Sequence, residues 1–207
     1  PYSSASAFAG NPLFIDPYRM VRDGLVDARS LKNLKRKVKN RVKFKSAAKA
    51  KHAFIGEAFK KFNLGANREI TKKYHAFLDK ERYWLEDFAL FSCLMDQFNN
   101  QPWNNWPDEY RDRDSKTLET FSTLYDEQLE IIRFTQFIFS QQWEETRQYA
   151  NDKGIGIFGD IPIYVDFNSA DVWAHQELFK LDQQRQMSSV AGVPPDYFNK
   201  EGQHWGM

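Results

Sequence analysis

The sequence has few of the features that mark secreted or membrane-spanning proteins. It contains one cysteine in 207 residues, so no disulfide can form within the chain. No signal peptide opens the sequence, and no apolar run approaches the roughly 20 residues needed to cross a bilayer. These absences favour a reducing, cytoplasmic setting, and we expect no membrane partner. The lone cysteine, Cys93, lies in an apolar run that predicts burial.

Signatures of metal sites, cofactor sites and activated nucleophiles are also missing. The four histidines show no metal-ligand spacing, and no serine or cysteine lies in a nucleophile motif. Residues 154–159, GIGIFG, have the glycines of a dinucleotide-binding loop but precede no helix start. We therefore expect neither a metal nor a cofactor.

Charge is nearly balanced overall but is concentrated in one basic segment. The formal net charge is +1, yet residues 28–56 hold eleven Lys or Arg and no acid, which leaves a balance of −10 elsewhere. Such a segment can contact nucleic acid or another anionic surface. Because no zinc-finger, glycine-rich or base-stacking motif accompanies it, we favour a solvated face or a loop stabilised by the acidic remainder. Nucleic-acid binding is the alternative.

Aromatic residues are abundant, at 16% of the chain, and many follow a helical period. Apolar positions recur every three to four residues over 44–62, 67–98 and 115–153, which predicts three long amphipathic helices with aromatic core stripes. A shorter helix is predicted from about residue 17 to residue 26, with Asp16 as its N-cap. Between the second and third long helices, Trp103 and Trp106 form either a ligand platform or a core cap, and we slightly prefer the core cap.

The pattern changes after residue 153. Residues 154–165 are apolar and β-branched and follow a long helix, which is the order found in a parallel α/β sheet or barrel. One such strand cannot form a sheet, so its partners are expected outside this sequence. Asp160 lies where the strand gives way to a loop, and barrel active sites form at the carboxyl ends of strands. A structural salt bridge is the alternative role for this acid.

A second group of residues suited to binding follows in residues 190–205. The stretch VAGVPPDYF, residues 190–198, joins a rigid Gly/Pro turn to one acid and two aromatic residues, and an amide and a tryptophan follow. Sugars present flat C–H faces edged with hydroxyls, which aromatic rings and carboxylate or amide groups complement. Prolines also lower the entropic cost of holding the loop. This segment is interpreted as sugar-binding, with a well-packed surface loop as the alternative.

Four motifs in order closely resemble the amylomaltases, the 4-α-glucanotransferases of glycoside hydrolase family 77. They are SASAFAGNPLFID (4–16), GDIPIYV (159–165), SADVWA (169–174) and VAGVPPDYF (190–198). The resemblance implies an α/β fold, in which this chain is a mostly α-helical fragment of a TIM-type (β/α)8 barrel with a large helical insertion. It also implies three regions: 1–16 as an active-site loop region, 17–113 as a helical insertion subdomain, and 114–207 as a barrel segment.

The resemblance further implies transfer of α-1,4-glucan segments between malto-oligosaccharides by a retaining double displacement. The family's Arg-x-Asp nucleophile context and its acid/base Glu motif do not occur here, so this chain alone is expected to be inactive and to contain no catalytic residue. By resemblance, Tyr2 stacks on a glucose and Asp160 supports the reacting sugar. A mobile loop that covers the glucan and excludes water contains Asp196, Tyr197, Phe198, Gln203 and Trp205.

Two further expectations accompany the resemblance. Asn168 stands where the family commonly has Asp, which puts a local ion pair in doubt. The alternative function is a non-catalytic glucan-binding or interaction module derived from such an enzyme.

Overall fold

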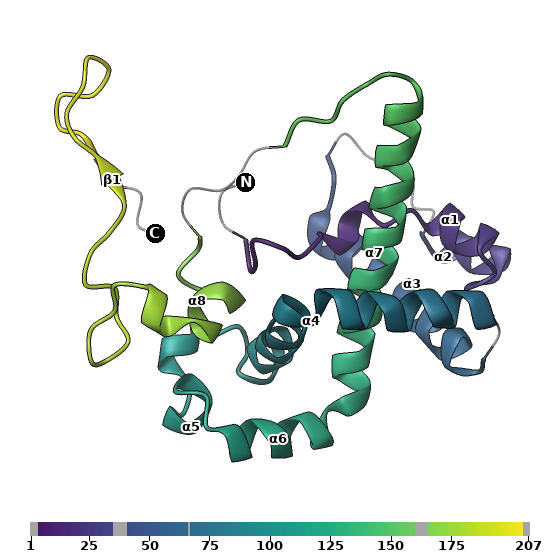
Figure 1. The fold of residues 1–207 in the computed structure, drawn as a ribbon, viewed down its shortest axis with the longest axis horizontal. Helices are drawn as coiled ribbons and strands as arrows, with labels where there is room; N and C mark the ends of the chain where they lie inside the picture. Colours follow the sequence, from purple (N-terminus) through teal and green to yellow (C-terminus); the bar gives the residue numbers. More distant parts are fainter. Residues whose placement is uncertain (1–3, 35–40, 66, 160–164, 205–207) are drawn as a thin grey trace. The chain divides into compact units, whose positions relative to one another are not determined.

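The structure, a computed structural model, describes residues 4–34, 41–65, 67–159 and 165–204 (Figure 1). These residues are mainly helical, as the sequence predicts. The chain divides into two compact units. We call Gly10–Leu85 with Glu127–Gly159 the helical unit, and Pro1–Ala9, Glu86–Asp126 and Asp160–Met207 the loop unit.

The helical unit combines predicted helices with three short elements that the sequence analysis did not predict: the 3-10 helices η1 (Pro12–Phe14) and η2 (Ala28–Ser30) and the helix α2 (Leu31–Leu34). Its other elements are the helices α1 (Pro17–Arg22) and α3 (Phe44–Asn63), the first half of α4 (Arg68–Gln97), and nearly all of α7 (Asp126–Asp152). The bounds of α3 and α4 agree with the predicted ranges to within one residue.

Helix α1 begins as predicted and ends earlier. The Asp16 carboxylate accepts a hydrogen bond from the Tyr18 amide at 2.8 Å, which confirms the predicted N-cap. The helix ends at Arg22 rather than near residue 26, because Gly24 adopts a φ of 73°. The Leu25 amide then bonds to the Met20 carbonyl at 2.9 Å, which closes the helix in a Schellman turn.

Aromatic side chains form the centre of the helical unit. Phe59 of α3, Tyr74 of α4 and Phe134 of α7 are buried and belong to one apolar cluster. The ring centroids of Phe59 and Phe134 are 5.5 Å apart, and those of Tyr74 and Phe134 are 6.2 Å apart. The Tyr74 hydroxyl also donates to a Glu130 carboxylate oxygen at 2.7 Å. The predicted aromatic stripes are therefore core.

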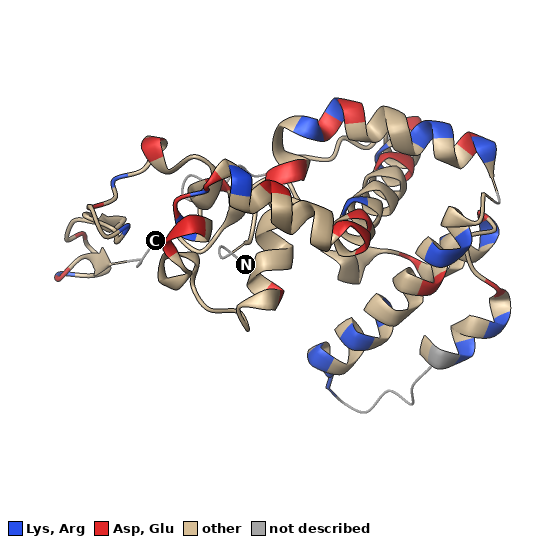
Figure 2. Ribbon diagram, turned by 90° about the horizontal axis from the view of Figure 1, so that it is seen from below, with Lys and Arg blue, Asp and Glu red and all other residues tan. Residues whose placement is uncertain are grey.

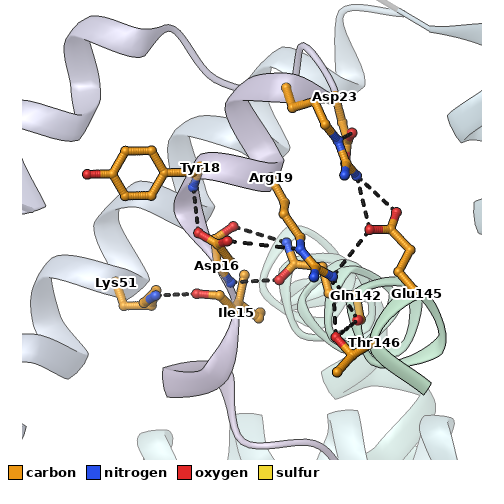
Figure 3. A network of polar contacts seen from close by, with 10 residues as sticks. Ile15, Asp16, Tyr18, Arg19, Asp23, Lys51, Gln142, Glu145 and Thr146 are labelled. Atoms are coloured by element: carbon orange, nitrogen blue, oxygen red, sulfur yellow. Dashed lines mark hydrogen bonds and ion pairs between the residues drawn. The ribbon is translucent and has the colours of Figure 1, made fainter. Parts of the chain in front are cut away.

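Two buried glutamines of α7 hold the segment that leads into α1. Gln136 accepts from the Gly10 amide at 2.8 Å and donates to the Gly10 carbonyl at 3.1 Å. Gln142 makes the same pair of bonds to Asp16, at 2.6 and 3.1 Å (Figure 3). The Lys51 ammonium donates to the Ile15 carbonyl in the same network, and burial lowers the pKa of this lysine.

The loop unit contains the second half of α4 and several short elements. These are η3 (Trp103–Asn105), α5 (Asp108–Arg111), α6 (Ser115–Leu124), α8 (Ala170–Ala174), η4 (Gln176–Leu178), and the strands β1 (Gly192–Val193) and β2 (Gln203–His204). Trp103 and Trp106 are buried, so the preferred interpretation of them as core is confirmed. Burial also raises the pKa of the Cys93 thiol to about 11.

The predicted helix over residues 115–153 is wrong at one point, because it is two helices that separate at Tyr125. The Tyr125 ring stacks on Phe121 with centroids 4.4 Å apart, and its hydroxyl donates to the Gln97 side chain at 2.9 Å. These contacts hold the residue outside helical geometry, with φ −112° and ψ 25°. No glycine or proline marks the break.

The strand predicted over residues 154–165 is also not found in its described part. Residues 155–159 have no strand, and residues 160–164 lie outside the described residues. Ile155, Ile157 and Phe158 are exposed rather than buried. A strand is defined by hydrogen bonds to a neighbour, and the described residues provide none here.

The basic segment is in part outside the described residues, since 35–40 are among those not described. The side chains of Lys43, Lys45 and Lys49 are exposed, in agreement with a solvated face. Figure 2 marks the Lys and Arg positions along the ribbon in blue and the Asp and Glu positions in red. Among the described helices, none is both long enough and apolar enough to cross a membrane.

Candidate functional site

The predicted sugar-binding segment folds as a short antiparallel hairpin. Strands β1 and β2 pair with Gly192 opposite His204 and Val193 opposite Gln203. Gly192 is required by the pairing, because a Cβ there would lie 2.4 Å from the Gln203 carbonyl oxygen. Gly202 has a φ of 71°, which lets the chain turn back into β2.

The tip of the hairpin is organised by the Asp196 carboxylate. Its Oδ1 accepts from the Phe198 amide at 2.9 Å and from the Asn199 amide at 2.7 Å. The Asn199 carbonyl in turn accepts from the Asp196 and Gly202 amides, at 3.0 and 3.2 Å. Asp196 therefore shapes the turn with one oxygen of its carboxylate.

The two aromatic residues at the tip face solvent. Tyr197 is 94% exposed and Phe198 is 91% exposed. Their rings contact edge to face, with centroids 5.5 Å apart and an interplanar angle of 89°. Two adjacent exposed rings on a hydrogen-bonded turn form an apolar surface that can stack on a flat ligand.

Elsewhere in the loop unit, the turn over residues 165–169 is fixed to Trp103. The Trp103 indole N–H donates to the Phe167 carbonyl at 2.8 Å, and the Trp103 amide donates to the Asn168 side-chain oxygen at 3.1 Å. The Asn168 backbone N–H donates to Oδ1 of Asp166 at 2.8 Å. Asn168 acts as an acceptor toward Trp103, so an amide at this position provides the acceptor that an aspartate would provide.

The segment that follows Tyr2 in sequence is fixed to the same part of the loop unit. The Ala170 amide donates to the Ala5 carbonyl at 2.8 Å. The Ala7 amide donates to a carboxylate oxygen of Asp171 at 2.9 Å. Ser6, between these two contacts, is buried. Asp171 has no distinguishing signal in the sequence except its place in a motif that resembles the family.

An open cavity of about 510 Å³ lies at the base of the hairpin. It is lined mainly by apolar residues from three segments: Val165 and Phe167, Val172 of α8, and residues 179–192, which lead into the hairpin. Its lining includes Val165, the first described residue after Asp160 in the sequence, and Gly192 of β1.

An ion pair holds the turn that precedes the hairpin. Arg185, whose φ is 59°, donates from Nε to Asp112 at 3.0 Å. The neighbouring Arg111 guanidinium, and after it Arg185, hold the pKa of the Asp112 carboxyl below its ordinary value. This pair connects the end of α5 to residues 182–187.

The structure describes four of the seven predicted site residues and brings them together in one hairpin: Asp196, Tyr197, Phe198 and Gln203. The other three, Tyr2, Asp160 and Trp205, lie outside the described residues. In the described ranges, no group of three or more His, Cys, Asp or Glu side chains is placed to hold a metal ion.

Comparison with known proteins gives consistent matches over the whole chain. The family model of 4-alpha-glucanotransferases, glycoside hydrolase family 77, matches residues 1–207. A 4-alpha-glucanotransferase of Thermus thermophilus is 40% identical over 206 residues, and one of Aquifex aeolicus is 37% identical over 206 residues. Each match covers 100% of this chain and 40% of the relative.

A solved structure agrees with these matches. The amylomaltase of Streptococcus agalactiae in complex with acarbose superposes with a TM-score of 0.90 at 34% identity, covering 100% of this chain and 41% of that one. The chain thus spans about two fifths of the length of the relatives that it matches. Since the family model matches every residue of the sequence, the chain belongs to the 4-alpha-glucanotransferase family, glycoside hydrolase family 77.

Proposed function

We propose that this chain is part of a 4-alpha-glucanotransferase that transfers α-1,4-glucan segments between malto-oligosaccharides. The observation that carries the proposal is the match of the family model to all 207 residues. The structural likeness to an amylomaltase in complex with acarbose supports a binding partner of malto-oligosaccharide type. The reaction is a retaining double displacement, in which a second sugar takes the place of water as acceptor.

In this proposal the chain supplies substrate-binding groups, and the nucleophile and acid/base lie beyond it. It is a fragment of a TIM-type barrel, with 1–16 as a loop region at the active site, 17–113 as the helical insertion and 114–207 as a barrel segment. The apolar stretch over residues 155–158 is exposed in this chain. Barrel strands are apolar because neighbouring strands and helices cover them, so the exposed stretch supports a strand whose neighbours belong to the rest of the barrel.

The hairpin is proposed to act as a lid over the bound glucan. Tyr197 and Phe198 stack on the sugar, while Asp196 shapes the turn. Gln203 of β2 and, by family resemblance, Trp205 add further contacts. By the same resemblance, Tyr2 stacks on a glucose and Asp160 supports the reacting sugar. The exposed rings on an ordered turn support this role, since a lid must present apolar surface to the ligand and exclude water from the intermediate.

The test uses the longer protein that contains this chain, with maltotriose as substrate. We expect glucose and longer maltodextrins as products. Replacing both rings, Tyr197→Ser with Phe198→Ser, should lower transfer roughly tenfold, because ~1.4 kcal/mol of lost stacking corresponds to that factor. The share of hydrolysis should rise, and the melting temperature should stay unchanged, because the two side chains are almost fully exposed.

Leu178→Ser is the matched control, since Leu178 is an exposed apolar residue of the same unit outside the hairpin. Its transfer rate should equal that of the unaltered protein. Hydrolysis products without any chain lengthening in the unaltered protein would contradict the transferase. Glucan binding without either reaction would favour the alternative, a non-catalytic glucan-binding module.

A further inference from the structure

Asp171, in the first turn of α8, makes a contact that the proposed function leaves unexplained. Its carboxylate accepts from the Ala7 amide at 2.9 Å, although the two residues are 164 positions apart in the sequence. The adjacent Ala170 amide donates to the Ala5 carbonyl at 2.8 Å. Two hydrogen bonds from consecutive residues fix both the position and the direction of residues 5–7.

Helix α8 is a firm base for this contact despite its five residues. Ser169 is fully buried and caps the helix through the Val172 amide at 3.3 Å. Trp173 is fully buried as well, and its indole N–H donates to the Tyr110 carbonyl at 2.9 Å. The Arg113 guanidinium lies 4.2 Å from the centre of the Trp173 ring. Motion of α8 therefore requires that buried contacts break.

The turn that precedes α8 is fixed as well. Phe167 and Asn168, which closely precede α8, are bonded to Trp103. Residues 167–168 are thus held by Trp103, and residues 170–171 hold residues 5–7. The proposed function assigns sugar contacts to Tyr2 and Asp160, each of which precedes one of these fixed segments in the sequence.

We propose that Asp171 is a positioning residue for glucan binding, whose carboxylate fixes residues 5–7, the segment that follows Tyr2 in the sequence. The inference rests on the proposed function, and Asp171 acts through this segment rather than by touching the sugar. Together with the Ala170 amide, it holds residues 5–7 against the first turn of α8. A binding surface held in this way loses less entropy when the glucan binds.

The first test measures amide hydrogen exchange in the longer protein. In Asp171→Ala, peptides that cover residues 4–9 should exchange at least about tenfold faster, because the Ala7 amide has lost its charged acceptor. Asp171→Asn keeps an acceptor oxygen and should stay close to the unaltered protein. Glu177→Ala is the control, since Glu177 is a nearby exposed acid that lies 3.8 Å from the His175 imidazole. Unchanged exchange in Asp171→Ala would show that this carboxylate does not hold residues 5–7, and it would overturn the proposal.

The second test separates positioning from chemistry by steady-state kinetics with maltotriose. Asp171→Ala should raise KM about tenfold and leave kcat within about twofold, because it loosens a binding loop and leaves the reacting groups in place. Asp171→Asn should restore most of the affinity. Loss of kcat at constant KM, or equal defects in the two variants, overturns the positioning role.

A third variant removes the hydrogen bond from the Ala170 amide to the Ala5 carbonyl and leaves the Asp171 carboxylate unchanged. Ala170 is the first residue of α8, where proline is tolerated, and Ser169 before it is extended, with φ −124° and ψ 159°, as a residue before proline prefers. Ala170→Pro deletes the amide that bonds to Ala5, so it should raise KM as Asp171→Ala does. A normal KM in this variant would overturn the claim that the hydrogen bond to Ala5 helps to position residues 5–7.

Failure of the proposed function has a different result. An unaltered protein that lengthens no maltotriose overturns the transferase, and with it the role of Asp171 in glucan binding. An active unaltered protein with a normal KM in Asp171→Ala overturns only the positioning role.

Discussion

At the residue scale, Gly10 shows how a missing side chain permits a contact between backbone and helix. A Cβ at this position would lie 1.9 Å from Cδ1 of the Phe139 ring. The close approach is what allows Gln136 to bond to both the amide and the carbonyl of Gly10. The small residue is therefore required by the packing of this segment on α7 rather than by a positive φ.

We predict that Gly10→Ala lowers the free energy of unfolding by about 1–3 kcal/mol, because the ring or the backbone must shift to admit the methyl group. Chemical denaturation in urea measures this change. Gly56→Ala is the control, since Gly56 lies within α3 and a methyl group on its Cα would have no neighbouring atom within 4 Å. That change should stabilise the helix by about 0.5–1 kcal/mol. Equal effects of the two substitutions would contradict the packing argument.

At the scale of elements, local patterns predicted the long helices well because their aromatic stripes repeat over many turns. Helix α3 and helix α4 agree with the sequence prediction, and Asp16 caps α1 as expected. The break at Tyr125 was not predictable from local pattern, because it depends on contacts with Phe121 and with Gln97, which is distant in sequence. Tertiary contacts decide such boundaries.

In the candidate site too, the features set by residues close in sequence were predictable, and those set by residues far apart were not. The turn at residues 196–202 follows from local chemistry, namely an Asp that caps its own turn and a glycine at positive φ. The attachment of residues 5–7 to α8 joins distant parts of the chain through backbone groups and one carboxylate. Backbone groups have no residue-specific signal, so sequence reasoning had nothing from which to infer this attachment.

Helix α7 also gives a prediction at this scale, through Gln142. Replacing it by alanine removes both bonds to the Asp16 backbone and should cost about 2–3 kcal/mol of unfolding free energy, since two polar groups lose their partners. Gln142→Glu keeps the acceptor but loses the donor, so its cost at neutral pH should be at least as large. Gln148→Ala, whose side chain bonds to the exposed end of the same helix, should have little effect. A thermal unfolding series measures all three.

At the scale of the whole molecule, the stretch after α7 leaves apolar side chains exposed. Ile155 is 60% exposed and Phe158 is fully exposed, although both belong to an apolar run. Exposed apolar runs are normally covered by another part of the same protein or by a partner. The matched relatives are more than twice as long as this chain, and the proposed barrel would place neighbouring strands over this stretch.

The 207-residue chain on its own should therefore bind more of the dye ANS per molecule than the longer protein does. In the short chain, Ile155→Ser with Phe158→Ser should reduce dye fluorescence and leave the helical circular dichroism unchanged, because neither side chain is packed there. In the longer protein, the same pair should lower the unfolding free energy by on the order of 2–4 kcal/mol, because both side chains would be buried. Equal dye binding by the two proteins, with no destabilisation of the longer one, would show that this stretch stays exposed and would remove the structural support for the barrel.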